Sequence, residues 1–431
     1  MIFNEDGFYR TIIEHSLRFR NFKSANKTLV DYRMNDNFFD CDGIFRKIVS
    51  APAEDALRSG FTLTGVEKVE QEKLFSVLED LESEKHFSTA LSWDRLHGGA
   101  AILILADDGG TLEEPLNEKS IRNIERLEVY SPEDLTFTAD YFYKDPFDKR
   151  YGNPEFYNVV GRYGNSFLVH ESRLLIFHGG IISNERRRAR NGWGGTVSEQ
   201  ISDVLAHYKE SLRLSVAALE KMSQDIMKLD GMQTIMQNDF GEEQIQKRLR
   251  LIDMYRHLEN IVAIDTKDEY DRKNLSLSGV KDIIEQAMYA LSAATGIPST
   301  ILFGRSPAGL SATGDADMEN YYNLVGRIQK RTLRPNLMQL IYLIGLSSDY
   351  DVKLPETWSI AFNPLWNPSE KEKAETDKII ADTLAQKVNA AKTLVELGAL
   401  DGAEVRKTVA ESGDYVTDSS LDEILSAGVD E

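Results

Sequence analysis

The sequence predicts an α+β fold in which mixed α/β segments surround a pair of helices. Apolar residues recur at helical spacing over several long stretches, whereas short runs of alternating apolar and polar residues fill residues 124–177. In residues 296–315, glycines, prolines and small hydroxyl residues interrupt two helical patterns. We therefore expect this segment to be a displayed loop between rigid helices.

Composition limits the class of protein. A chain of 431 residues is long enough for two or more domains or a segmented single fold, and its 42% hydrophobic content can bury real cores. No stretch approaches the ~18 apolar residues of a membrane span and the first residues do not resemble a signal peptide, so we expect a soluble protein. The single cysteine, Cys41, excludes an intramolecular disulfide and a thiolate metal cluster, which fits a reducing cytoplasm.

The formal net charge of −20 argues against a protein whose main task is to grip nucleic acid, because such binding depends on clustered lysines and arginines. The acidity is typical of a protein that is kept soluble by its charge. A channel wall along which DNA slides without sticking would also be acidic, but only a family resemblance makes that interpretation specific.

The N-terminal part predicts helices followed by strands. Residues 38–59 and 70–96 each show helical periodicity. Residues 98–105 begin with two glycines and continue as an apolar run, which predicts a buried strand that another backbone approaches closely. A phosphate-binding glycine loop is the alternative, but no Lys-Ser or Lys-Thr follows. The alternating runs in residues 124–177 predict an antiparallel β region.

Residues 184–195 form the only dense basic run of the chain. Three interpretations stay open for it: a solvated turn, a patch that faces DNA, and a contact with the acidic flank of a neighbouring subunit. The arginines in question are Arg186, Arg187, Arg188 and Arg190.

The central part predicts an antiparallel helical hairpin that carries a small head. Thr196 and Glu199 form a capping box that opens a helix expected to continue to residue 226. Residues 280–295 form a second amphipathic helix. The insertion between them, residues 232–279, is expected to be a small α/β unit with a helix over residues 242–259 and a strand over residues 261–264.

The C-terminal part begins with a helix over residues 318–346 that contains Pro335, where proline must kink it. A strand is expected over residues 358–362. Ser369 and Glu372 form another capping box, which opens a helix to about residue 397. The last residues, 411–431, hold seven acidic and no basic side chains and are expected to fray.

Four segments, in this order along the chain, carry a family resemblance: Gly98-Gly99-Ala100, residues 169–179, residues 296–322, and Phe362-Asn363-Pro364-Leu365-Trp366. From residue 38 to residue 409 the chain resembles the tailed-phage portal proteins, specifically the portal group that bears an anti-CBASS name. The resemblance implies a portal fold with a mixed α/β wing, long stem helices, a small α/β clip, a tunnel loop and a kinked helix. The implied segments are the wing (1–195), stem helix 1 (196–230), the clip (231–279), stem helix 2 (280–297), the tunnel loop (298–315), the kinked helix (316–346), the wing return (347–368), and a crown-like helical region with the acidic tail (369–431).

The resemblance implies a ring of about twelve copies at one vertex of a phage capsid. Double-stranded DNA would pass through it without sequence preference during packaging and ejection. The implied partners are the terminase large subunit, head completion or connector proteins, and the major capsid or scaffold protein, with no membrane and no cofactor. The implied location is the virion, and the host cytoplasm during assembly.

The resemblance also implies which residues have functional contacts. Arg305 is the one cation of the tunnel loop and would contact phosphate transiently, although a salt bridge between subunits is an equal alternative. The other loop residues expected to face DNA are Ser306, Ser311, Thr313 and Asp315. The clip residues expected to contact terminase or connector proteins are Glu242, Glu243, Lys247 and Arg248.

A cyclic-nucleotide phosphoesterase of the anti-CBASS type is the alternative function, because such enzymes use two H-x-[ST] motifs. The chain has His86-Phe87-Ser88 and His170-Glu171-Ser172. His86 lies in a charged helical run, and the portal pattern itself contains His170. No Walker lysine and no metal-ligand spacing are present, so we expect neither a catalytic site nor a metal site.

Overall fold

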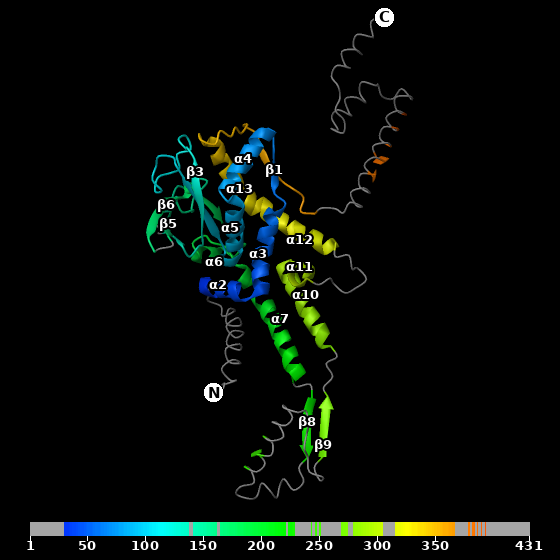
Figure 1. The fold of residues 1–431 in the computed structure, drawn as a ribbon. Coiled ribbons are helices and arrows are strands. Elements are labelled where there is room, and N and C mark those ends of the chain that lie inside the picture. Colours follow the sequence, from blue (N-terminus) through cyan, green and yellow to red (C-terminus); the bar gives the residue numbers. More distant parts are fainter. Residues whose placement is uncertain are drawn as a thin grey trace. The chain divides into compact units, whose positions relative to one another are not determined.

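The chain divides into two units, Met1–Leu365 and Trp366–Glu431. The computed structural model describes residues 30–137, 141–161, 164–220, 223–228, 269–274, 279–304 and 315–366, together with single helical positions at 243, 246, 247, 250, 378, 379, 382, 383, 386, 389 and 393. The fold below is that of the first unit (Figure 1). No helix within these residues has both the length and the apolar character that crossing a membrane requires.

A three-stranded antiparallel sheet separates two hydrophobic cores. The middle strand is β2 (Ala100–Ala106), and it pairs with β3 (Ile124–Tyr130) and β7 (Leu174–Phe177). Ile102 and Ile104 face the larger core, whereas Ala101 and Leu103 face the smaller one. A strand with buried residues on both faces has a continuous apolar sequence, so the prediction of a buried strand here is confirmed.

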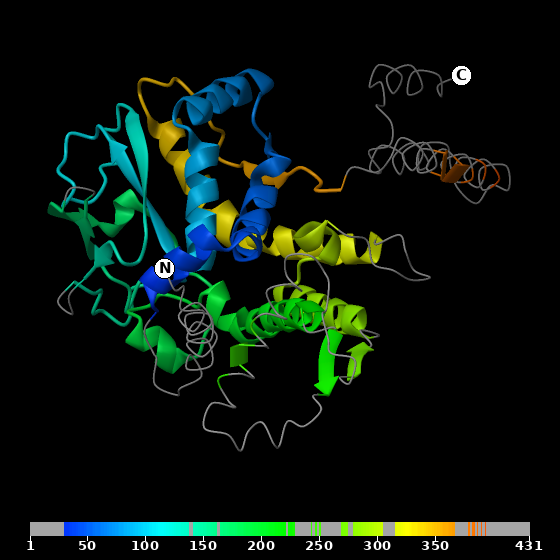
Figure 2. The ribbon, with the colours of Figure 1, turned by 60° about the horizontal axis from the view of Figure 1, so that its bottom comes forward.

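Helices form the larger core on one face of this sheet (Figures 1 and 2). The described helices of this layer are α2 (Tyr32–Cys41), α3 (Gly43–Arg58), α4 (Lys68–Asp80), α5 (Ser83–His97) and α13 (Arg334–Leu346). Two expected helices are each divided in two. The Asp42 side chain accepts hydrogen bonds from the N–H groups of Ile44 and Phe45 and so starts α3, while Glu82, at φ 46°, breaks residues 70–96.

The predicted antiparallel β region is confirmed and covers the opposite face. Strands β4 (Leu135–Thr136), β5 (Phe156–Val160) and β6 (Ser166–His170) form a second sheet. Tyr157, Val159 and Val169 bring it into the smaller core. The predicted strand over residues 358–362 is confirmed as β10 (Ser359–Phe362), which pairs with β1 (Phe61–Thr64).

Two helices, α7 (Val197–Glu220) and α10 (Val280–Thr295), pack side by side and extend away from the sheets, and we call this pair the stem (Figure 1). The capping box is confirmed, since the Thr196 N–H donates to Glu199 Oε2 at 3.2 Å and the Glu199 N–H donates to Thr196 Oγ1 at 3.3 Å. The helix does not continue to residue 226, because β8 (Ser223–Lys228) pairs antiparallel with β9 (Glu269–Asn274). Pairing with a segment far along the chain overrides the helical pattern there.

The segment after α10 is only partly the expected loop. Residues Ser299–Phe303 form α11, and Ile297 and Leu302 are buried, so the expectation of a wholly displayed loop is wrong at its start. Residues 305–314 lie outside the described residues. On the far side, α12 (Asp315–Ile328) is joined to α3 by a hydrogen bond from the Tyr321 hydroxyl to Asp55 at 2.5 Å.

The expected irregularity at Pro335 takes the form of a π-helical turn, Gln329–Leu333, directly before α13. Proline has no N–H to donate to the preceding turn, which favours a break in the regular pattern at this place. The buried Gln329 side chain donates to the Ala56 carbonyl at 2.9 Å and so fixes the turn against α3. In the second unit, the described positions from Lys378 to Thr393 are helical, as expected for residues 369–397.

Three backbone segments cross at Gly98, Gly179 and Gly194. The Gly194 N–H donates to the Gly98 carbonyl at 2.8 Å, and the Gly179 N–H donates to the buried carboxylate of Asp94 at 2.6 Å. A Cβ atom on Gly179 would lie 2.2 Å from the Gly98 oxygen, and one on Gly194 would lie 2.3 Å from the His178 oxygen. The close approach predicted from the glycines before β2 is therefore confirmed.

We predict that Gly179→Ala destabilises the protein by about 2 kcal/mol or more beyond the ordinary cost of its backbone conformation, because the backbone atom that its methyl group meets cannot rotate away. Gly109→Ala is the matched control: Gly109 has φ +77° against +72° for Gly179, but a Cβ there has nothing within 4 Å. The control should cost about 1–2 kcal/mol. Equal losses of unfolding free energy in denaturant titrations would contradict the steric argument.

Candidate functional site: a basic pocket and an apolar stem

The basic run is a short helix followed by a buried arginine. Helix α6 (Asn184–Ala189) exposes Arg186, Arg187 and Arg188. Arg190 instead points inward, where its guanidinium bonds to Glu199 and donates to the Gly194 carbonyl at 3.1 Å. Contact with DNA or another subunit was one of the interpretations left open for Arg190, but only 5% of this residue is exposed and its charge is paired with Glu199 within the subunit.

The Arg190–Glu199 pair connects the basic helix to the stem. Burial alone would raise the pKa of the Glu199 carboxyl, but hydrogen bonds from Arg190 and the field of that arginine lower the pKa below its usual range. The same carboxylate closes the capping box of α7. The start of the stem and the end of the basic run are therefore held by one ionised group.

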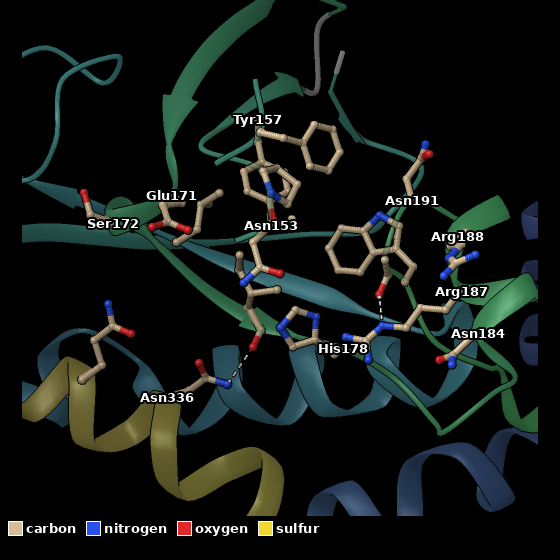
Figure 3. A pocket seen from close by; sticks show the side chains of 18 residues that line it. Asn153, Tyr157, Glu171, Ser172, His178, Asn184, Arg187, Arg188, Asn191 and Asn336 are labelled. Atoms are coloured by element: carbon tan, nitrogen blue, oxygen red, sulfur yellow. Dashed lines mark hydrogen bonds between the residues drawn. The ribbon is translucent and has the colours of Figure 1, made fainter. Parts of the chain in front are cut away.

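A polar pocket of about 860 Å³ opens beside α6 (Figure 3). Arg187 and Arg188 lie toward one side of it and Glu171 toward the other. The Arg187 Nε atom donates to the Gly192 carbonyl at 3.3 Å. Burial, and secondarily the charge of Arg187, lower the pKa of His178, so this imidazole is neutral at pH 7. The α6 side of the pocket is suited to an acidic group, and its other lining residues include Tyr157, Ser172, Trp193 and Asn336.

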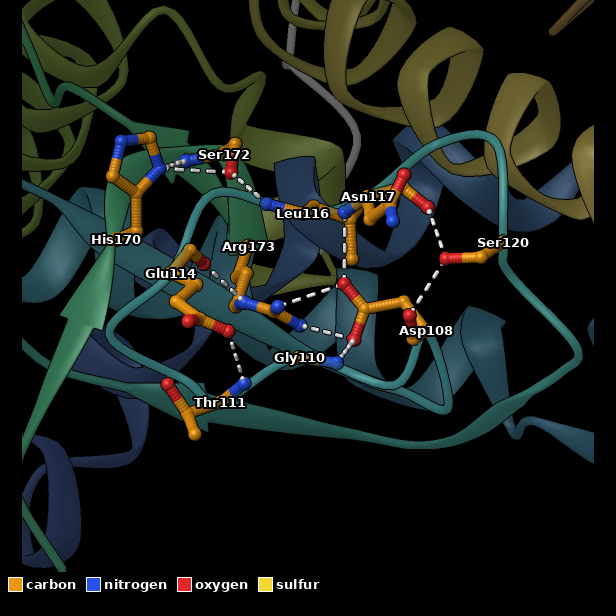
Figure 4. A network of polar contacts seen from close by, with 10 residues as sticks. All are labelled: Asp108, Gly110, Thr111, Glu114, Leu116, Asn117, Ser120, His170, Ser172 and Arg173. Carbon is orange, nitrogen blue, oxygen red and sulfur yellow. Dashed lines mark hydrogen bonds and ion pairs between the residues drawn. The ribbon is translucent and has the colours of Figure 1, made fainter.

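A buried ion pair holds the segment after β2 (Figure 4). Arg173 donates to both carboxylate oxygens of Asp108, at 2.7 and 3.2 Å, and its Nε atom donates to the Glu114 carbonyl at 2.9 Å. The N–H groups of Asn117 and Gly110 donate to the same carboxylate. Burial raises the pKa of Asp108, but these hydrogen bonds together outweigh it and hold the pKa below its usual range.

We predict that Arg173→Met costs about 3–5 kcal/mol of unfolding free energy near pH 7, because it leaves a buried carboxylate without its partner. Asp108 has a lowered pKa in the folded state, so its contribution is present above the pKa of the unfolded carboxyl and is lost as the pH falls through the folded pKa. The difference in unfolding free energy between wild type and variant should therefore become smaller as the pH falls.

Arg126→Met is the control for that experiment. Its guanidinium pairs with Glu128 at 3.3 Å, but the arginine side chain is 65% exposed. An exposed pair contributes about 0–1 kcal/mol. If Arg173→Met loses no more unfolding free energy than Arg126→Met, the buried Asp108–Arg173 pair does not stabilise the fold as predicted.

The H-x-S motif at His170 closes a turn. The Ser172 hydroxyl accepts a hydrogen bond from the Leu116 N–H at 2.8 Å, so its own hydrogen is available for His170 Nδ1, also at 2.8 Å. The Ser172 N–H donates to the same Nδ1 atom. This arrangement makes Nδ1 an acceptor and starts the short helical turn Glu171–Arg173.

The two H-x-S motifs do not meet in one pocket. Ser172 lines the pocket beside α6, whereas Ser88 lines a different pocket between β1, α4 and α5. The charged groups that act on His86 are Lys85, Glu82 and Glu128, and those that act on His170 are a separate set. The described geometry therefore offers no shared site of the kind that a two-histidine phosphoesterase needs.

We predict that the purified protein turns over neither cyclic nor linear nucleotides, and that Ser172→Ala lowers its stability by about 1–3 kcal/mol by leaving the Leu116 N–H without an acceptor. Ser88→Ala should be nearly neutral. Turnover of a cyclic dinucleotide that disappears when both His86 and His170 are changed to alanine would contradict this prediction.

The stem changes character along its length. At the end nearer the sheets, Ile201, Leu205 and Leu291 are buried in the larger core. Farther along, apolar side chains face solvent: Leu214 is 53% exposed, Val216 56% and Ile283 60%. Exposed apolar side chains on two adjacent helices are typical of a region that other protein surfaces cover.

The remaining predicted contact residues divide between described and undescribed positions. Asp315 begins α12, and Pro335 lies in the first turn of α13. Glu243 and Lys247 are helical and form an exposed ion pair at 2.8 Å. The residues outside the described part of the chain are Arg305, Ser306, Ser311, Thr313, Glu242 and Arg248.

Three relatives give the chain a context among curated proteins. The "Anti-CBASS protein Acb1" of Caulobacter sp. is 27% identical over 312 residues, which cover 68% of this chain and 48% of that protein. An uncharacterized protein of Haemophilus influenzae is 29% identical and covers 88% of this chain and 83% of its own length. The "Anti-CBASS protein Acb1" of Sphingomonas paeninsulae is 25% identical, over 92% of this chain and 63% of that protein. The chain thus spans about half of the Caulobacter protein.

Two solved structures are similar in outline. A chain from the neck of a native gene transfer agent particle, computed with C12 symmetry, has a TM-score of 0.48 at 13% identity and covers 90% of this chain and 93% of its own. An HK97 family phage portal protein from Corynebacterium diphtheriae has a TM-score of 0.39 at 9% identity and covers 76% of this chain and 95% of its own. The family model described as phage portal protein matches residues 37–386, which is most of the sequence. The chain belongs to the phage portal protein family.

Proposed function

We propose that the chain assembles into a ring of about twelve copies that forms the portal at a capsid vertex. One observation carries this proposal beyond family membership: the outer half of the stem exposes Leu214, Val216 and Ile283, which one copy alone leaves in water. Stems packed side by side around a ring would cover these side chains. The same packing would make a continuous wall around a central channel.

Double-stranded DNA would pass through this channel during packaging and ejection. A charge of −20 per chain supports sliding contact, because an acidic wall does not retain a phosphate backbone. We assign residues 298–315 to the constriction. Helix α11 lies at the start of this segment and α12 begins at its last residue, and both pack against α3, so residues 305–314 between them have fixed ends.

We assign residues 1–195 to the wing, 196–230 and 280–297 to the stem, and 231–279 to the clip. The clip would meet the terminase large subunit first and the head completion or connector proteins later, with Glu243 and Lys247 on its described surface. The ring would act as a mechanical part of the virion, assembled in the host cytoplasm, and would catalyse no reaction.

We predict that Leu214→Glu combined with Val216→Glu prevents ring formation, because two carboxylates would have to be buried between stems. The control pair is Phe147→Glu with Tyr151→Glu, two side chains on a wing turn that are 96% and 58% exposed. End-on class averages from electron microscopy and light scattering would measure the outcome. A wild-type chain that remains monomeric at micromolar concentration would contradict the portal proposal.

We predict that deleting residues 306–313 leaves the rings intact but reduces packaged or retained DNA. The deletion removes part of the proposed constriction but keeps the packed helices α11 and α12. Replacing the same residues with glycine and serine at equal length separates the need for length from the need for Arg305 and its neighbours. The measurement is the DNA content of particles made when each variant complements a portal-defective phage. Normal filling and retention by the shortened ring would show that this loop is not the constriction.

A further inference from the structure

Helix α6 and the residues before it form an exposed basic surface, which we define as Ile181, Arg186, Arg187 and Arg188. Ile181 is 89% exposed. No carboxylate among the described residues lies within ion-pair distance of the three arginines. The surface combines a bare apolar side chain with three cations in a chain whose net charge is −20.

An acidic groove of about 770 Å³ lies between β1, α4 and α5. Its floor is apolar, with Phe61 and Phe75 in ring contact at 5.4 Å between centroids, and Phe75 is 36% exposed. Its rim carries Glu79, Glu82 and Glu84. The cation in its lining, Lys85, is paired with Glu82 at 2.5 Å.

The two surfaces cannot meet within one copy. In Figure 2, α4 lies at the top of the first unit, whereas α6 lies at the lower left. Two complementary patches on opposite edges of a subunit produce a head-to-tail contact, which repeats from copy to copy and closes when the rotation between copies allows a ring.

We propose that the basic surface of one copy docks into the acidic groove of the next copy in the ring. The inference rests on the proposed function and adds a specific contact between wings to it. The three arginines face the carboxylates of the rim, and Ile181 lies against the aromatic floor. Charge complementarity of this kind fixes the register between neighbours as well as adding to their affinity.

The exposed isoleucine favours the acidic groove of a neighbouring copy over DNA as the partner of the basic surface. A phosphate backbone would neutralise the arginines, but it offers nothing to a fully displayed isoleucine. The groove offers both, because its acidic rim surrounds an aromatic floor. Each kind of feature on the basic surface, charged and apolar, therefore has a counterpart in the groove.

The test is a charge exchange in the full-length chain. Arg186→Glu, Arg187→Glu and Arg188→Glu together should reduce the ring fraction at least about tenfold at physiological salt, and so should Glu79→Arg, Glu82→Arg and Glu84→Arg together. Combining the two sets should restore rings, because the charges are exchanged and the contact is retained. Lys119→Glu, Lys144→Glu and Lys149→Glu, three exposed lysines elsewhere, change the charge by the same amount as the arginine set and should leave rings unchanged.

Circular dichroism and thermal unfolding confirm that each variant is folded before its rings are counted. Rings that survive the arginine set would overturn the inference, and so would a combined variant that is folded but does not assemble. If the arginine set keeps its rings but loses binding to a short DNA duplex, the occupant is DNA and the inference is wrong. A wild-type chain without rings overturns the proposed function itself, so the two failures can be told apart.

Discussion

The close crossing of backbones at Gly98, Gly179 and Gly194 is the constraint on which the rest of the structure depends. It joins the end of α5, the end of β7 and the link into α7 at one place. The neighbouring Gly99 leaves room for Trp193, because a Cβ on Gly99 would lie 2.3 Å from the indole ring. The crossing therefore fixes the positions at which the stem and α6 are joined to the sheet.

Two charged residues of α5, Asp94 and Arg95, connect the crossing to the rest of the fold. Burial raises the pKa of Asp94 to about 6, although the hydrogen bond from Gly179 opposes it. Since the folded pKa is raised, Asp94 makes stability decrease as the pH rises from its unfolded value toward 6. Burial likewise lowers the pKa of Arg95 to about 10, and this guanidinium donates to the carbonyls of Ile48 and Val49 on α3. Helix α5 thus connects the crossing to the helical core.

The sequence predicts those elements whose signals are local. The α10 boundaries, the capping box of α7 and the buried strand β2 follow from periodicity, capping chemistry and an apolar run. The missed features depend on partners far along the chain. Strand β8 lies in a helical pattern but pairs with β9, and Ile297 lies in a glycine- and proline-rich segment but is buried against helices.

The polar sites also depend on the fold, because local sequence signals do not indicate which charged groups are paired. Arg190 is one of several neighbouring arginines, and only the position of Glu199 in the fold turns it inward. Asp108 and Arg173 are 65 residues apart, and no short motif indicates their pairing. By contrast, glycines before a strand already indicate a close backbone approach, because few other reasons place two of them there. Sequence patterns therefore predict helices and strands better than they predict which charged groups are paired.

In the proposed ring, the charge of the chain would determine which contacts can hold the copies together. Copies that each carry a charge of −20 repel one another, and salt screens that repulsion over about 8 Å at physiological ionic strength. Apolar contact between stems is insensitive to this screening, but it is also non-directional. The proposed contact of a basic surface with an acidic groove would supply direction at short range, where the screening is weakest. In the proposed ring, stem and wing would thus contribute different properties: the stem exposes apolar side chains that neighbouring copies would cover, and the proposed wing contact would determine how those copies are oriented.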